Sequence, residues 1–165
     1  MASYVRYMDR TREYYTRRGY DQAYKWAHFE DVPFTPLKKP LSECRVALIS
    51  TSEIAVRDVD REGGAEMMSN LGGVYSIPSD VPLERLYSTS HSYDRAATTL
   101  DDVDAYFPIS AMRAARESGR IGEVTRRFHG VYNAYSQRIT RERDAIEVVR
   151  RCREDGADVA VLVPV

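Results

Sequence analysis

The hydrophobic positions of this chain gather in short apolar runs that polar stretches separate. The clearest run, residues 159 to 165, follows an amphipathic segment that ends at Gly156. An unbroken apolar run of this length is typical of a parallel strand covered on both faces. Residues 45 to 50 predict the central strand, residues 84 to 88 a further strand, and residues 74 to 77 a short one. We therefore expect a short, mainly parallel sheet built from residues 45 to 50, 84 to 88 and 159 to 164.

The 3.6-residue period of a helix is strongest between residues 136 and 155. Four apolar residues fall at i, i+1, i+4 and i+7 and predict one stripe buried against the sheet. They are Ala145, Ile146, Val149 and Cys152. A second helix is expected from Ser110, its N-cap, to Ser118, with Met112 on its buried side. A helix, a glycine and an apolar strand form half of a βαβ unit, so the predicted fold class is three-layer α/β, flavodoxin-like or Rossmann-like.

Residues 1 to 40 read differently from the rest of the chain. Aromatic and charged side chains alternate between residues 3 and 28, which predicts two helices broken at Gly19. Three prolines between residues 32 and 40 exclude a helix and predict an extended surface linker. We expect residues 1 to 40 to form an aromatic-rich helical arm with its linker, and residues 41 to 165 to form the α/β domain. The arm suits helix packing or a subunit interface better than base stacking.

Composition excludes several classes of protein. A 43% hydrophobic and 30% charged content is ordinary for a soluble domain, and a net charge of -1 gives no support for a nucleic-acid partner. No apolar run approaches the roughly 20 residues of a membrane-spanning helix, and the first 28 residues are too polar for a signal peptide, so a cytoplasmic protein is expected. Cys44 and Cys152 lack metal-ligand spacing, so no metal site is predicted, and Cys152 is expected to be a small buried hydrophobe.

Polar residues follow two of the predicted strands, as chemistry at a sheet edge requires. Ser50 and Thr51 end the central strand, and His91 comes just after residues 84 to 88. The carboxyl ends of parallel strands share one edge, where α/β folds bind ligands. Asp94, three residues after His91, could fix the tautomer of an acid–base histidine. The alternative on this spacing is a histidine that braces a loop.

Other polar patterns lead away from metal and nucleotide sites. The carboxylates at 101, 102 and 104 lack the glycine and the distal glutamate of a calcium loop, so a turn before a helix is the better interpretation. The glycine pairs at 63–64 and 72–73 match no phosphate-binding loop, which weakens a flavodoxin-like nucleotide-binding function.

Several segments, taken in order, resemble the selenoprotein B family of glycine, sarcosine, betaine and D-proline reductases. They are residues 39–41, 45–51, 91–94, 102–109, 119–122 and 155–164. Asp104 departs from the family pattern, which has asparagine at the matching position. The resemblance implies an α/β reductase subunit in which a selenocysteine or cysteine, followed by a second cysteine, attacks the C–N system of a small amine or amino-acid derivative, with a disulfide as acceptor.

In that family the redox motif directly follows the strand that resembles residues 159 to 164. The resemblance therefore implies no cofactor in residues 1 to 165 and a redox-active selenocysteine or cysteine beyond Val165. A UGA codon read as a stop would explain the missing motif, and so would a naturally short binding module.

The function expected on this resemblance is the substrate-side portion of a selenol- or thiol-dependent reductase subunit. Its expected catalytic residues are His91 and Asp94, and its expected substrate contacts are Ser50, Thr51 and Tyr93. The alternative is a non-catalytic interaction or assembly subunit, with other reductase subunits or a second copy bound through the N-terminal arm.

Overall fold

The computed structural model describes residues 6–20, 22, 25, 27–59, 72–91, 93, 96–97 and 99–165. Two compact units, Met1–Phe34 and Thr35–Val165, divide the chain. Within the described part of the chain, no helix combines the length and the apolar character that crossing a membrane requires.

The first unit contains a single helix over its described residues, α1 (Tyr7–Arg17). The helix ends at Arg17, and Gly19, with a φ of 85°, follows in a turn in which its N–H donates back to the carbonyl of Thr16 at 3.0 Å. The predicted break at Gly19 is therefore confirmed, whereas a second helix is absent from the described residues between 20 and 34. No residue of α1 is buried, and Tyr15 makes edge-to-face ring contacts with its neighbours Tyr14 and Tyr20.

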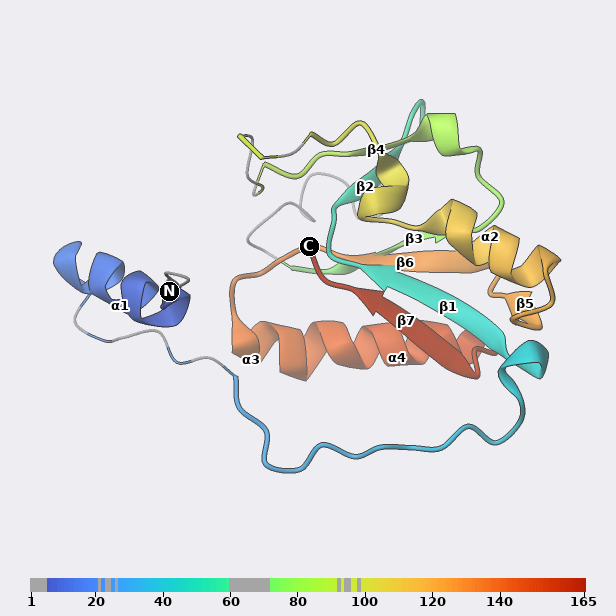
Figure 1. The fold of residues 1–165 in the computed structure, drawn as a ribbon, viewed down its shortest axis with the longest axis horizontal. Helices are drawn as coiled ribbons and strands as arrows, with labels where there is room; N and C mark the ends of the chain where they lie inside the picture. The colour runs from blue at the N-terminus through green and yellow to red at the C-terminus, as the bar shows by residue number, and fades with distance from the viewer. Residues whose placement is uncertain are drawn as a thin grey trace, which may run out of the picture. The chain divides into compact units, whose positions relative to one another are not determined.

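The second unit is built on a mixed sheet with β1 at its centre. Its strands are β1 (Arg45–Ser50), β3 (Val74–Pro78), β5 (Glu123–Val124), β6 (Arg127–Val131) and β7 (Val159–Val163). Strands β5 and β6 share one edge of β1 and β7 takes the other, all parallel to it, while β3 pairs antiparallel with β6. Figure 1 shows β1 between β6 and β7. The mainly parallel sheet and the central position of residues 45 to 50 are confirmed.

The register gathers the strand ends at one edge. Ser50 pairs with Gly130 of β6 and with Val163 of β7. The parallel strands β1, β6 and β7 therefore end together, and Val74, the first residue of β3, lies opposite Val131 at the same place. We call this the carboxyl edge of the sheet.

Residues 84 to 88 do not join this sheet, contrary to the prediction. Strand β4 (Leu86–Ser88) instead pairs antiparallel with β2 (Ile54–Val56) in a separate two-stranded sheet. The chain leaves β1 and turns at once into β2, which supplies the partner strand that β4 needs. The strand that fills the predicted place is β6, in which His129 and Gly130 interrupt the apolar run that a buried strand normally shows.

Helices cover the two faces of the sheet and give the predicted three layers (Figure 1). Helix α2 (Ile109–Glu117) packs on the face that carries Val46 and Leu48, and the large core side chains lie here. They include Tyr75, Phe107, Phe128 and Tyr132. The last helix packs on the opposite face, where His129 and Ser76 point because side chains alternate along a strand.

That last helix has three parts and turns its predicted apolar stripe outward. It consists of α3 (Gln137–Ile139), the π-helical segment η5 (Thr140–Asp144) and α4 (Ala145–Glu154). Ile146 is 62% exposed and Val149 47%, while Cys152 is half-buried, so the prediction of a buried stripe was wrong. The buried side of the helix is polar instead: Asp144, Arg151 and Asp155 are 1%, 8% and 7% exposed.

The closing strand β7 is an edge strand, which corrects the expectation of a strand covered on both faces. Among the described residues it pairs with β1 alone, and Leu162 is 71% exposed. Its apolar composition cannot distinguish a covered strand from an uncovered one, because composition reports what a strand could bury and not what lies beside it.

Candidate functional site

Four hydroxyl side chains form hydrogen bonds where β1 and β4 end, to one another or to nearby backbone carbonyls. We call them the hydroxyl cluster: Ser50, Ser52, Ser88 and Thr89. The Ser50 hydroxyl donates to the carbonyl of Tyr106 at 2.9 Å, so it accepts from the hydroxyl of Ser52 at 2.7 Å. The Ser88 hydroxyl donates to the Ser52 carbonyl. These bonds fix two loops that are 36 residues apart in sequence.

Glu53 is the strained residue of this junction. Its φ of 53° is in the left-handed region, which costs a non-glycine residue about 1–2 kcal/mol. The conformation presents its carbonyl to Thr89, whose N–H and hydroxyl both donate to it at 3.1 and 3.2 Å. Non-glycine residues in such conformations concentrate at functional sites, where surrounding contacts offset the strain.

Thr51 ties the end of β1 to the end of β7. Its hydroxyl donates to the carbonyl of Val165 at 3.1 Å and accepts from the N–H of Val165 at 2.9 Å. Its own N–H donates to the carbonyl of Val163 at 3.3 Å. The backbone around Val165 is therefore held against the loop that carries the hydroxyl cluster.

The structure places the predicted site residues unequally. Ser50 is 1% exposed and its hydroxyl proton is committed to the Tyr106 carbonyl, while Thr51 is half-buried beside Val165. His91 is exposed, two residues after the Thr89 that anchors the loop, and Tyr93 is half-buried. Asp94 lies outside the described residues.

Tyr75 supports the same junction from β3. Its hydroxyl accepts from the N–H of Ile54 at 2.6 Å, directly after Glu53. Its ring passes over Gly130, where an added Cβ would lie 1.9 Å from the ring. Gly130 is thus required by close approach, a role that the sequence analysis did not predict.

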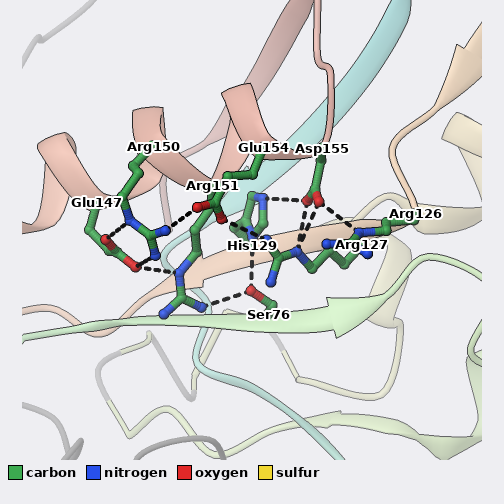
Figure 2. A network of polar contacts seen from close by, with 9 residues as sticks. All are labelled: Ser76, Arg126, Arg127, His129, Glu147, Arg150, Arg151, Glu154 and Asp155. Atoms are coloured by element: carbon green, nitrogen blue, oxygen red, sulfur yellow. Dashed lines mark hydrogen bonds and ion pairs between the residues drawn. The ribbon is translucent and has the colours of Figure 1, made fainter.

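The opposite face of the sheet holds a buried polar network, shown in Figure 2. His129, fully buried on β6, lies between Ser76 of β3 and Asp155 at the end of α4. Its Nδ1 is 3.0 Å from the Ser76 hydroxyl, and its Nε2 is 3.4 Å from Asp155 Oδ2. Arg151 reaches from α4 and donates to the Ser76 hydroxyl at 2.8 Å.

Arg151 donates to the Ser76 hydroxyl, which also shares a hydrogen bond with His129 Nδ1. The direction of that second bond follows the tautomer of His129, whose Nε2 faces Asp155. Although burial would raise the pKa of Asp155, hydrogen bonds from Arg127 and Arg126 hold that pKa below its ordinary value.

At the other end of the network, Glu147 receives the guanidinium groups of Arg150 and Arg151. These hydrogen bonds lower the pKa of Glu147 to about 2. A chain of polar contacts therefore runs from Glu147 through Arg151, Ser76 and His129 to Asp155.

The residue types of this network match a Ser-His-Asp nucleophilic site, but their surroundings do not. His129 is fully buried, and the Ser76 hydroxyl already bonds two protein groups. A nucleophile must meet a substrate, so this arrangement suits fixing α4 on the sheet and not catalysis. The sequence did contain a signal for it: polar residues at 144, 147, 151 and 155 follow helical spacing.

Neither cysteine lies at the carboxyl edge. Cys44 is buried immediately before β1, and Cys152 is in the last turn of α4, before β7 begins. Burial and the nearby Asp155 raise the pKa of Cys152, which disfavours the reactive thiolate. Over the described stretches of the chain, no three metal-ligating side chains gather in one place.

Comparisons with known proteins relate this chain to one family of reductases. The model of the family Glycine/sarcosine/betaine reductase selenoprotein B (GRDB) matches residues 11–164. The "Betaine reductase complex component B subunit beta" of Peptoclostridium acidaminophilum is 29% identical over 130 residues, which are 75% of this chain and 28% of that relative. The chain thus spans about a quarter of that relative's length. None of the solved protein structures matches it.

Proposed function

Because this chain belongs to the glycine/sarcosine/betaine reductase selenoprotein B family, we propose that it forms the substrate-side part of a selenol- or thiol-dependent reductase subunit. The proposed reaction cleaves a C–N bond in a small amine or amino-acid derivative. The two electrons come from a selenol or thiol and a neighbouring cysteine thiol, which end as an oxidised pair. Polypeptide outside residues 1–165 supplies that pair, since Cys44 and Cys152 are both remote from the carboxyl edge.

The observation that carries this proposal is the junction at the carboxyl edge. Thr51 joins the ends of β1 and β7, and the hydroxyl cluster fixes the adjoining loop with Glu53 in a strained conformation. Ligands of α/β sheets bind at such an edge, where strand ends supply polar groups. A reactive chalcogen brought to the end of β7 would face this fixed loop.

Each residue has a role in the proposal. His91, which is exposed, exchanges a proton with the substrate, and Asp94 orients its imidazole. Thr51 and Tyr93 contact the substrate. Ser50, being buried, acts beneath the loop by holding its conformation.

Binding of small amines tests the proposal on the chain itself. We expect glycine, sarcosine, betaine or D-proline to shift the backbone amide signals of residues 51–53 and 89–91 in an NMR titration. His91→Ala should weaken that binding, whereas His28→Ala, an exposed histidine of the first unit, should not. The assigned site would be refuted if the amines leave these amide signals unshifted, or if His91→Ala and His28→Ala bind the amines equally well.

A second candidate function is favoured by the exposed aromatic residues of α1. Tyr7 is 76% exposed, and Tyr14 and Tyr15 are 50% and 42% exposed, on a helix that buries nothing. Such a surface suits an assembly subunit that docks on other reductase subunits. Capture of a purified partner subunit that needs residues 1–30 and ignores His91→Ala would favour this function over the reductase site.

A further inference from the structure

The last helix turns its polar side toward the sheet and its apolar side outward. Its buried side carries Arg151 and Asp155, which belong to the polar network, and Asp144, which pairs with Arg143. On the opposite side, Ile146 and Val149 are 62% and 47% exposed. An apolar helix face that the fold does not cover marks a contact surface.

Two charged residues extend this face and give it a defined order. Glu142 precedes Ile146 by four positions and Arg153 follows Val149 by four, so all four lie on one side of the helix. Glu142 and Arg153 are both exposed. We call the sequence Glu142, Ile146, Val149, Arg153 the outer stripe: an acid, two apolar residues and a base.

The outer stripe is complementary to itself. If a second helix of the same sequence lies antiparallel about a point midway between residues 146 and 149, Ile146 meets Val149 of the other copy. Glu142 then meets Arg153 of the other copy, at both ends at once. A two-fold axis makes such a contact closed, because the same patch serves both subunits.

We propose that two copies of this chain associate through their outer stripes, with the helices of residues 137–154 antiparallel about a two-fold axis. The helix is about 27 Å long at 1.5 Å per residue, which permits contact along several turns. Arg153 forms no ion pair with any residue that the structure describes, and Glu142 pairs only with Arg138 at 3.2 Å, where both side chains are at least 65% exposed. Both charges are therefore available to a partner. This inference rests on the helix and not on the proposed reductase function.

The outer edge of β7, where no strand pairs among the described residues, is the competing surface. It is apolar, with Leu162 71% exposed, but its five residues carry no charge that would select a register or a partner. The outer stripe specifies orientation through its two unlike ends, and for this reason we assign the self-association to it.

Sedimentation or light scattering of the purified chain over a concentration series tests the proposal. We expect a monomer–dimer equilibrium that Ile146→Lys shifts to monomer by at least tenfold in the dissociation constant. Ala111→Lys, on the exposed side of α2, is the matched control and should leave the equilibrium unchanged. Circular dichroism should show all variants folded, since the substituted positions are exposed. A chain that stays monomeric at every concentration would overturn the proposal, and so would a dimer that Leu162→Lys abolishes and Ile146→Lys does not.

A charge exchange tests the antiparallel order itself. Glu142→Arg alone places like charges at both ends and should weaken the dimer about tenfold, as should Arg153→Glu. The double variant Glu142→Arg with Arg153→Glu restores unlike pairs and should return the dissociation constant to within about threefold of the original. Failure of the double variant to recover would contradict this arrangement, whatever the amine titrations show.

Discussion

Different interactions stabilise the two faces of the sheet. On the α2 face, the side chains of Leu48, Phe107 and Phe128 are at most 1% exposed, and apolar packing supplies the stability. On the α4 face, His129, Arg151 and Asp155 occupy the equivalent interior position and are joined by hydrogen bonds and ion pairs. The α2 face tolerates other apolar side chains of similar volume. The α4 face depends on polar groups that are paired with one another, so a substitution there leaves a partner without its hydrogen bond.

This difference explains why the α2 face was easier to predict. Burial of apolar area leaves a pattern in the sequence, and Met112 was correctly expected to be buried because of it. A buried polar network leaves a pattern that looks like a solvated helix face. The comparison can be tested by disturbing each face in turn.

The largest effect is expected from Phe128→Ala on the α2 face. Removing a fully buried ring leaves a cavity and should lower the free energy of unfolding by about 3–5 kcal/mol. Ile146→Ala removes an exposed side chain and should change the free energy of unfolding by less than about 0.5 kcal/mol. Denaturant unfolding of both variants, at a concentration where the chain is monomeric, measures the difference. Equal losses would show that the outward orientation of Ile146 is wrong.

The α4 face should respond next, and its response should depend on pH. Asp155→Asn removes the charge that accepts from Arg126 and Arg127, and we expect a loss of about 2–3 kcal/mol in the free energy of unfolding at pH 7. The pKa of Asp155 is below its ordinary value in the fold, so the folded state holds fewer protons than the unfolded state. The stability from its charge is therefore present above about pH 4 and is lost as the pH falls below that value.

Denaturant unfolding between pH 7 and pH 3 measures this dependence. The gap between the original chain and Asp155→Asn should narrow on acidification. Asp158→Asn, which alters an exposed pair with Lys39, is the control and should show a much smaller gap at pH 7. A gap for Asp155→Asn that stays constant down to pH 3 would show that its charge does not stabilise the fold.

The same contrast explains how much of the structure could be predicted from the sequence. The central strand at residues 45 to 50 and the helix before Gly156 were predicted because apolar periodicity and a glycine stop are local signals. The position of β6 in the sheet was not predicted, because the contacts of His129 with Ser76 and Asp155 join segments that are far apart in the sequence. Residues 84 to 88 were assigned to the wrong sheet because a three-residue strand does not specify its partner.

The candidate site was predictable to a similar extent. The strand-end rule led to Ser50 and Thr51, and Thr51 does join the ends of β1 and β7. No rule of spacing could foresee that Ser50 would be buried, or that the Tyr75 ring would cross Gly130. Those contacts depend on how distant segments meet.

A smaller effect is expected where Tyr75 crosses β6. Gly130→Ala would force the ring away from the N–H of Ile54, and we expect a loss of about 1–3 kcal/mol in the free energy of unfolding. Adding Tyr75→Ala should remove the clash, so the double variant should lose less than the sum of the two single losses. Strictly additive losses would show that the ring and the glycine do not meet.

The smallest effect concerns Asp104, where the resemblance to the family led us to expect asparagine. Its Oδ1 accepts from the N–H of Ser110 at 2.8 Å in the first turn of α2. Asparagine offers a carbonyl oxygen at the same place, so Asp104→Asn should change the free energy of unfolding by less than about 0.5 kcal/mol, while Asp104→Ala should cost about 1 kcal/mol. Thermal unfolding of the two variants separates these outcomes. If Asp104→Asn proves as costly as Asp104→Ala, the negative charge itself matters at the start of α2, and the hydrogen bond to Ser110 alone does not explain the contribution of Asp104 to stability.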